Sequence, residues 1–387
     1  MNRSLRIAML AHSTNPRGGV VHALHLSEAL ADLGHEVVLH APDASGKGFF
    51  RAAGCGVRPF PVGPAPADMT AMVIRRIEDY VRHFEEKDVS GFDLYHAHDG
   101  ISGNALATLK ARGRISGFMR TVHHVDNFAD PHLNHLQARS IDEAAGLFTV
   151  SDHWRTWFAE RGRDSVKVGN GVDMTRFSPD RDESDLRLAG RLPRGAGPVF
   201  LAVGGVERRK NTLGILRAFA QVLAVRPDAR LIIAGGVSLL DHRTYQAAFS
   251  AELAARPHLA AAVTFLGGVA DEDMPALFRS ADALVFPSLM EGFGLVVLEA
   301  MASGLPVVVS SVTPFTEYVP SDAAVWCDPR RASSIADAML TVLSPRIRQG
   351  CIEAGRRVAA RHDWRSVAMA HLPAYYAFTG SKEMAHA

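Results

Sequence analysis

The chain has 387 residues, enough for two domains of ordinary size, and its hydrophobic fraction of 47% can supply a sizeable core in each. A formal net charge of +1 gives no support for nucleic-acid binding through bulk electrostatics and leaves room only for a local basic patch at a membrane. The three cysteines are scattered without metal-ligand spacing, which argues against a disulfide framework and favours a reducing cytoplasm. A predicted strand begins at Leu5, so we expect no signal peptide, and no apolar run reaches the roughly 20 residues of a membrane span.

The first predicted unit is a strand over 5–12, a turn that ends in Gly18 and Gly19, and a helix over 20–33 closed by a glycine. A strand, a glycine loop and a helix start together form a cradle suited to phosphate. We therefore favour ligand contact for Gly18 and Gly19, although glycines at such turns can be purely structural. The G-x-G-x-x-G spacing of a dinucleotide site is absent.

Two further strands of the first half are predicted to end in polar residues. The strand that begins at Phe92 ends in His98 and Asp99, and parallel strands present functional groups at their C-terminal ends. These two residues are candidates for contact with a substrate, on the acceptor side if the chain transfers a group. Alternatively, they form a strand end that only caps the next helix. The strand from Phe118 ends in the pair His123 and His124.

The second half opens after a charged, Gly/Pro-rich segment over 180–197, which predicts an interdomain linker. A strand over 199–204 then leads into three consecutive cations, Arg208, Arg209 and Lys210, followed by a helix over 212–225. Three cations in one strand–helix loop could clamp a diphosphate, or could form a solvated cationic turn.

Two more strands, over 230–234 and 263–266, are each followed by a glycine pair, at 235–236 and 267–268. The acidic run over 271–273 resembles a metal-binding cluster. Because it precedes an apolar helix, where acidic residues favour the helix start, we prefer a role at that start to a metal site.

The stretch over 281–310 predicts a buried strand, a loop around Glu291, a helix from Leu295, and a second buried strand. Gly294 lets the backbone approach a ligand closely, and the N–H groups at Phe293, Gly294 and Leu295 can bind an anion. Glu291 and Glu299 lie eight residues apart and suit hydroxyl groups. A phosphate site beside a polyol site is the chemistry of a nucleotide sugar, although an ordinary strand–helix–strand unit with two solvated glutamates is the plain alternative.

This stretch also resembles a known family. Its E-x7-E spacing around Gly-Phe-Gly-Leu, and the Asn-Gly-Val-Asp and Phe-x-Pro pattern over 166–179, are similar to the GT4 family of retaining glycosyltransferases. The resemblance implies the GT-B fold, an α/β architecture of two Rossmann-like doubly wound domains that face an interdomain cleft. It places an acceptor-side domain at 1–180, a donor-binding domain at 196–363, and a helix at 364–380 that crosses back to the first domain.

The resemblance also implies roles for single residues. Lys210 matches the lysine that holds the donor phosphates, and His123, or alternatively His124, matches a histidine that contacts the transferred sugar near its reacting carbon. Glu299 would hold the ribose hydroxyls and Glu291 a sugar hydroxyl, while the paired glycines of the second half would line the nucleotide base.

The chain departs from the family at one position. The family usually has an arginine just after the first glycine of the second half, and this position is Gly205 here. Arg208 or Arg209 would then supply the missing charge, and we favour Arg209 because it adjoins Lys210.

Together these features predict a cytoplasmic retaining glycosyltransferase that moves a hexose from a nucleotide-diphosphate sugar to an unidentified hydroxyl. A UDP-sugar is favoured by family frequency, and GDP-mannose is the second choice. We expect no metal or other cofactor, because cationic side chains and helix-tip amides can stabilise the departing diphosphate. The alternatives are a nucleotide-binding scaffold that has lost catalysis and a GT-B sugar-nucleotide epimerase.

Overall fold

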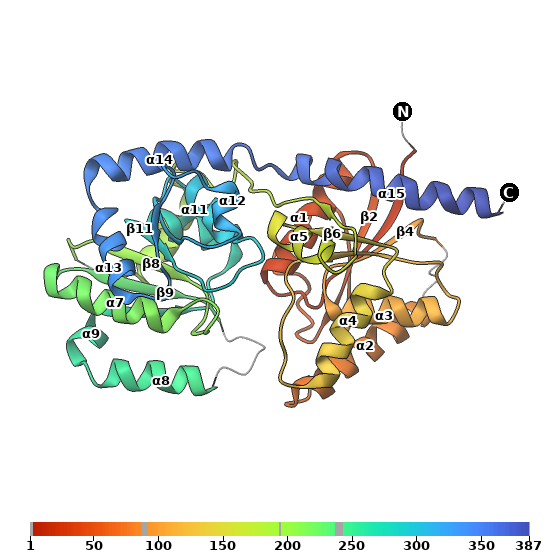
Figure 1. The fold of residues 1–387 in the computed structure, drawn as a ribbon, viewed down its shortest axis with the longest axis horizontal. Coiled ribbons are helices and arrows are strands. Elements are labelled where there is room, and N and C mark those ends of the chain that lie inside the picture. Colours follow the sequence, from red (N-terminus) through yellow and green to blue (C-terminus); the bar gives the residue numbers. More distant parts are fainter. Residues whose placement is uncertain (1–2, 87–90, 193–194, 237–242, 387) are drawn as a thin grey trace. The chain divides into compact units, whose positions relative to one another are not determined.

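The chain folds into two compact α/β units, which a computed structural model describes over residues 3–86, 91–192, 195–236 and 243–386. The first unit contains residues 1–170 together with 364–387, and the second contains residues 171–363. Each unit is built on one parallel sheet flanked by helices (Figure 1). The predicted fold class of two Rossmann-like doubly wound domains is confirmed.

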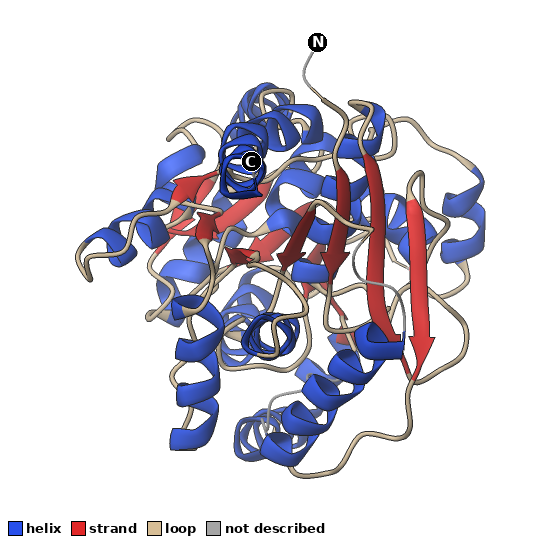
Figure 2. Ribbon diagram, turned by 90° about the vertical axis from the view of Figure 1, so that its right-hand side faces the viewer, coloured by secondary structure: helices blue, strands red, loops and turns tan. Residues whose placement is uncertain are grey.

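The first unit has a seven-stranded sheet in the order β3-β2-β1-β4-β5-β6-β7, and every neighbouring pair is parallel (Figure 2). Its strands are β1 (Arg6–Leu10), β2 (Glu36–Asp43), β3 (Gly56–Pro61), β4 (Leu94–Ala97), β5 (Met119–Val122), β6 (Gly146–Thr149) and β7 (Val166–Lys167). Its helices are α1 (Gly18–Asp32), α2 (Met69–Glu86), α3 (Gly100–Ala111), α4 (Pro131–Asp142), α5 (Asp152–Ala159) and α15 (Trp364–His386).

The central strands of this sheet are buried on both faces because helices cover both sides. All four residues of β4 and of β5 are buried, as are the four that follow Arg6 in β1. Strands covered on both faces appear in a sequence as continuous apolar runs rather than alternating ones. This is the pattern from which the sequence predicts these strands.

Helix α15 follows the second unit in sequence but belongs to the first. Its Tyr375 is fully buried and shares a hydrogen bond of 2.6 Å with Nδ1 of His96 in β4. Trp364, at its first turn, stacks on the ring of His25 from α1 with 5.0 Å between ring centroids. The predicted helix starts at the predicted residue and continues to His386.

The second unit has a six-stranded parallel sheet in the order β10-β9-β8-β11-β12-β13. Its strands are β8 (Val199–Val203), β9 (Arg230–Ala234), β10 (Val263–Gly267), β11 (Ala283–Phe286), β12 (Val307–Ser310) and β13 (Val325–Cys327). Its helices are α6 (Glu183–Ala189), α7 (Thr212–Val225), α8 (Arg243–Ala254), α9 (Pro257–Ala262), the 3-10 turn η1 (Asp271–Asp273), α10 (Met274–Arg279), α11 (Leu295–Ala302), α12 (Phe315–Tyr318), α13 (Ala332–Thr341) and α14 (Pro345–Ala359).

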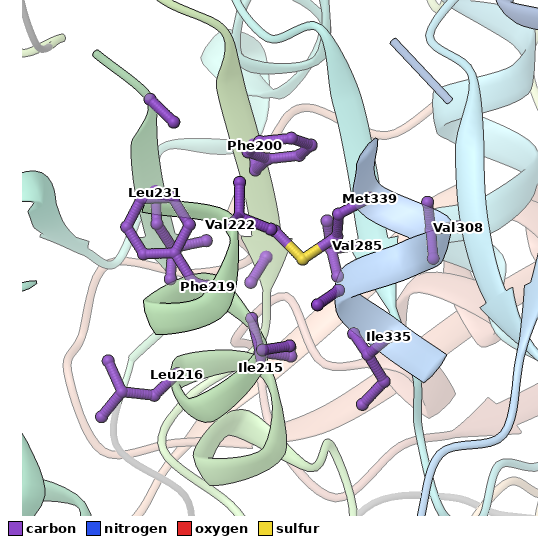
Figure 3. Packing of buried hydrophobic residues seen from close by; sticks show 14 of the residues in the cluster. Phe200, Ile215, Leu216, Phe219, Val222, Leu231, Val285, Val308, Ile335 and Met339 are labelled. Carbon is purple, nitrogen blue, oxygen red and sulfur yellow. The ribbon is translucent and has the colours of Figure 1, made fainter. Parts of the chain in front are cut away.

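One core cluster of this unit joins helices α7 and α13 to the sheet. Phe219 and Val222 of α7 and Met339 of α13 are fully buried and pack against Phe200 of β8 and Val285 of β11 (Figure 3). Burying one such side chain stabilises the fold by about 1.5–3 kcal/mol. The cluster therefore holds the strands whose ends carry the candidate site.

The charged segment over 180–197, which the sequence predicts as an interdomain linker, contains a short helix. Residues 183–189 form α6, which begins with a capping box between Asp182 and Asp185. Arg279 of α10 pairs with Asp185 at 2.6 Å, and Leu188 is buried. The charged composition reflects these caps and ion pairs rather than an unstructured segment, and residues 193–194 of the predicted linker lie outside the described residues.

Candidate active site

The candidate site of the second unit lies where the strand order of the sheet reverses. Successive crossovers run outward from β8 in one direction and from β11 in the other, and β8 and β11 are neighbours. Ligands of open parallel sheets bind at the carboxyl ends of strands at such a point. The loop after β8 carries Arg209 and Lys210, and the loop after β11 carries Glu291.

These three predicted residues form one ion-pair cluster. Oε1 of Glu291 lies 2.8 Å from Nζ of Lys210, and Oε2 lies 2.7 Å from Nη1 of Arg209. The amide of Leu289 also donates to the carbonyl of Arg209 at 2.9 Å, which ties the two loops together through their backbones. Burial alone would raise the pKa of Glu291, but Lys210 and Arg209 outweigh burial and lower it.

The two candidate arginines differ in environment. Arg209 pairs with Glu291, whereas Arg208 is exposed. Gly205, which stands where the family usually has an arginine, faces the backbone of Gly236. A Cβ atom on Gly205 would lie 2.6 Å from the Gly236 carbonyl oxygen, so this position has no room for a side chain without a shift of the backbone.

The sequence did not reveal how the cationic loop is fixed. Asn211, directly after Lys210, has a left-handed backbone with φ of 58°, and its Nδ2 donates to the carbonyls of Pro287 at 3.1 Å and Pro329 at 2.6 Å. Asparagine tolerates this conformation better than most residues because its side chain can bond locally. Asn211 thus anchors the loop that carries the two cations.

The Gly-Phe-Gly loop is braced from one side by Tyr318. The rings of Phe293 and Tyr318 stack with centroids 4.3 Å apart, and the Tyr318 hydroxyl donates to the Phe293 carbonyl at 3.2 Å. Gly294, with φ of 96°, is the residue before α11. Because glycine has no side chain, it cannot accept a hydrogen bond from the first N–H groups of this helix. Leu295 is the first helical residue, as predicted.

Glu299 lies on α11 and is half-buried. Burial raises the pKa of Glu299 to about 7. The Arg176 guanidinium lowers this pKa, and the Asp271 carboxylate raises it further. Arg176 in turn pairs with Asp271 at 2.7 Å. Arg176 is the arginine of the Phe-x-Pro segment, and no sequence pattern predicts that it lies near Glu299.

The acidic run over 271–273 precedes α10, as predicted, but no side chain caps that helix. Asp271 pairs with Arg176, and Asp273 pairs with Arg187 at 3.0 Å. Within the described ranges, no group of three or more His, Cys, Asp and Glu side chains could hold a metal ion.

In the first unit the sheet order reverses between β1 and β4, and the predicted residues follow β1, β4 and β5. A Cβ atom on Gly19 would lie 3.3 Å from Cδ2 of His123, while one on Gly18 would meet nothing within 4 Å. Gly19 therefore has a steric role against His123, and Gly18 has none. His124 instead pairs with Asp126 at 3.0 Å.

The structural alternative describes the other two candidates well. Asp99 caps α3 by accepting from the Ser102 amide at 2.8 Å. His98 is 2% exposed and lies 2.9 Å from the Met9 sulfur through Nε2. These contacts of Asp99 and His98 are all within the protein, and the role of the two residues in binding an acceptor stays a prediction.

No helix among the described residues has both the length and the apolarity that a membrane span requires.

Comparison with known proteins adds to this geometry. The model of the family described as glycosyl transferases group 1 matches residues 190–358, and that of the glycosyl transferase 4-like domain matches residues 17–171. The phosphatidyl-myo-inositol mannosyltransferase of Mycobacterium tuberculosis is 30% identical to the chain, with 97% of this chain and 98% of the relative covered. A D-inositol 3-phosphate glycosyltransferase of Catenulispora acidiphila is 31% identical, with 79% of each chain covered.

Among solved structures, that of HepE from Anabaena in complex with UDP-glucose superposes with a TM-score of 0.74. It is 18% identical in sequence, and the match covers 94% of this chain and 97% of that one. Three kinds of observation agree on the family: the two parallel sheets, the motif residues that meet at a strand reversal, and these matches. The chain is therefore a glycosyltransferase of the GT4 family with the GT-B fold.

Proposed function

We propose that the protein transfers a hexosyl group, with retention of configuration, from a nucleotide-diphosphate sugar to an acceptor hydroxyl. The observation that carries this proposal is the cluster of Glu291 with Lys210 and Arg209, at 2.8 and 2.7 Å, beside the uncapped start of α11. It brings cations, backbone N–H groups and a carboxylate to one strand reversal. A diphosphate linked to a sugar needs all three kinds of group.

The cluster suits the charge that develops during transfer. As the bond between C1 of the sugar and the phosphate oxygen breaks, negative charge grows on the nucleoside diphosphate. Lys210, Arg209 and the N–H groups at the start of α11 would stabilise that charge. The acceptor oxygen forms its bond to C1 on the same face, and its proton passes to the departing phosphate.

The carboxylates take the hydroxyl groups of the donor. Glu291 would release its two cations to the diphosphate and accept a hydrogen bond from a sugar hydroxyl. Glu299 would hold the ribose hydroxyls, and His123 would orient the sugar near C1. In this proposal Lys210 and Arg209 stabilise the departing diphosphate by themselves, so the reaction needs no bound divalent ion.

The choice of donor rests on similarity. The complex of HepE from Anabaena with UDP-glucose favours a UDP-sugar. The relative named a mannosyltransferase favours mannose as the sugar, so GDP-mannose, the second choice from the sequence, is the second donor to test. Glu299 contacts the ribose in this proposal, and ribose is common to both donors, so it does not discriminate between them.

Calorimetry with UDP, GDP and ADP, followed by turnover of the matching sugar nucleotides, tests the proposal. Relatives named for inositol compounds suggest myo-inositol, an inositol phosphate and phosphatidylinositol as first acceptors. We expect binding of one nucleotide, loss of that binding in K210A, and sugar transfer that persists in EDTA. Tight binding without turnover would instead indicate a scaffold, and donor conversion without an acceptor an epimerase.

A further inference from the structure

The Gly-Phe-Gly loop, residues 292–294, packs on the side chains of α12. The ring of Phe293 is nearly parallel to that of Tyr318, with 9° between the ring planes and 4.3 Å between the centroids. A Cβ atom on Gly294 would lie 2.6 Å from Cε1 of Phe315, so this close approach requires glycine. Phe293 is 7% exposed and Phe315 is fully buried. The loop is therefore supported by an aromatic surface.

The Tyr318 hydroxyl fixes the direction of one peptide group in this loop. It donates to the Phe293 carbonyl at 3.2 Å. Burial, aided by the Glu291 carboxylate, raises the pKa of Tyr318 well above its ordinary value, so the hydroxyl keeps its hydrogen. The Phe293–Gly294 bond is trans, and the C=O and N–H of a trans peptide point in opposite directions. Because Tyr318 holds the carbonyl, the Gly294 N–H points away from Tyr318.

This N–H group is one of two that can serve a ligand. The amides of Gly294 and Leu295 have no acceptor among the residues that the structure describes, so both can donate to an anion. The hydrogen bond from Tyr318 thus orients a donor of the proposed diphosphate site without any contact between Tyr318 and the diphosphate.

His362, which follows α14, packs against both rings of the stack. Its ring is tilted by 65° to that of Tyr318, with centroids 5.5 Å apart, and by 63° to that of Phe293, with centroids 6.0 Å apart. Nδ1 of His362 lies 2.9 Å from the carbonyl of Val358, one turn earlier in the chain, and this contact orients the ring. The end of α14 therefore supports the Gly-Phe-Gly loop through one side chain.

The backbone of His362 is bonded to the place where the chain enters the second unit. This unit begins at Gly171 and ends at Asp363, so these two ends connect it to the first unit. The amide of Val172 donates to the carbonyl of His362 at 2.8 Å, which joins the two ends to each other. One residue, His362, therefore contacts the loop through its ring and the paired ends of the unit through its carbonyl.

We propose that Tyr318 and His362 are positioning residues for the donor: Tyr318 directs the Gly294 N–H at the diphosphate, and His362 couples the loop to the paired ends of the second unit. The inference deepens the proposed function and rests on it for the identity of the ligand. An anion that binds the loop should slow the local opening of the Val172–His362 pair. By linkage, a firmer pair should favour anion binding by the same factor.

Calorimetry of Y318F with UDP tests the role of the hydroxyl. Phenylalanine keeps the stack on Phe293 and removes one hydrogen bond, so we expect the Kd for UDP to rise about fivefold. Y376F is a matched control, because the Tyr376 hydroxyl also donates to a backbone carbonyl at 3.2 Å, that of Arg3 in the first unit. A Kd that is unchanged in Y318F, or raised equally in Y376F, would contradict the role of Tyr318.

Hydrogen exchange of the full chain, read by mass spectrometry, tests the coupling. In wild type, saturating UDP should slow exchange about threefold or more in the peptide that contains Val172. H362A should still bind UDP but lose this effect, because alanine keeps the backbone bond and removes the ring. H362F should restore the effect, since its ring can pack against Phe293 and Tyr318. An effect at Val172 that is absent in wild type, or that persists in H362A, would overturn the coupling.

Measurements without nucleotide separate this inference from the proposed function. H362A should speed exchange across residues 292–297 in the free protein, and H258A, at an exposed histidine of α9, should not. If no nucleotide binds, the proposed function fails, but this result still decides whether His362 supports the loop. If sugar transfer occurs while H362A changes neither exchange nor the Kd for UDP, the proposed function stands and this inference fails.

Discussion

Glu291 and Lys210 lie 81 positions apart in sequence, yet their side chains are joined at 2.8 Å, and the second oxygen of Glu291 takes Arg209. The cations expected to hold a diphosphate are therefore already paired with a carboxylate in the free protein, although one carboxylate balances only one of their two charges. A phosphate that binds to them has to take the place of this carboxylate. The free energy of donor binding thus includes the loss of two ion pairs.

The first prediction concerns this exchange. E291Q should lower the melting temperature by about 4 °C, because two partly buried cations lose their carboxylate, a loss of about 1–2 kcal/mol once their solvent exposure is considered. UDP should then raise the melting temperature of E291Q more than that of wild type, since its phosphates no longer compete with Glu291. Thermal unfolding with and without UDP measures both effects.

The exposed Glu183 of α6 is the matched control for this experiment, and E183Q should behave as wild type. A stabilisation by UDP that is smaller in E291Q than in wild type would contradict the exchange. Sugar transfer by E291Q should fall sharply in either case, because the variant lacks the carboxylate for the sugar hydroxyl.

The second prediction separates the cations from the ribose site. K210A should lower kcat about 100-fold, because it removes a charge that stabilises the departing diphosphate. E299A should instead raise the donor KM about tenfold with a smaller change in kcat. R209A should resemble K210A, and R208A should remain within about twofold of wild type, as initial-rate kinetics would show. If K210A and E299A both left kcat/KM unchanged, the site assignment would be wrong.

The third prediction follows from the pKa of Glu299. Burial raises this pKa to about 7, above the ordinary 4.5, so the carboxyl is protonated below pH 7 in the free protein and ionised above it. The ionised form accepts hydrogen bonds from both ribose hydroxyls, so UDP affinity should increase as pH rises from 6 to 8, by up to tenfold for each pH unit below the pKa.

Two variants make this pH experiment specific. E299Q should lose the Glu299 contribution, and its profile then reports the titration of UDP itself. R176A should move the midpoint to higher pH, because the Arg176 guanidinium lowers the pKa of Glu299. Calorimetric affinities for UDP at four pH values would measure these effects, and identical profiles for wild type and E299Q would exclude Glu299 from the ribose site.

The fourth prediction concerns Gly205. Restoring the arginine that is usual in the family should damage this protein, because even a Cβ atom would lie 2.6 Å from the Gly236 carbonyl oxygen. We expect G205R and G205A to destabilise the second unit by similar amounts, about 1–3 kcal/mol, and to weaken UDP binding. Denaturant unfolding and calorimetry would check this. Tighter UDP binding by G205R would show instead that the backbone adapts and that the missing charge is limiting.

Much of the fold is predictable from sequence because the central strands are buried on both faces. Continuous apolar runs such as 199–203 and 283–286 end at glycine or polar loops, and both are strands in the structure. Helix α6 was missed because its charged residues outweigh its few apolar ones. The Asp182 and Asp185 pair, spaced as a capping box, is the local signal that could have revealed it.

The candidate site is only partly predictable for a different reason. Glu291 and Lys210 were identified through a family resemblance, and no local pattern predicts that they touch. Tyr318 ends α12 and Arg176 lies in the Phe-x-Pro segment, and no pattern within either segment predicts that these side chains approach the site.

The placement of α15 has a consequence for how the protein forms during synthesis. Residues 1–170 are made before the second unit, but Trp364, His371 and Tyr375 complete their interior and are made after it. The later unit, residues 171–363, is continuous and can finish before the earlier one. Synthesis of α15 would therefore time the completion of the first unit, and a truncated product that ends near residue 363 would expose its apolar interior to chaperones and proteases.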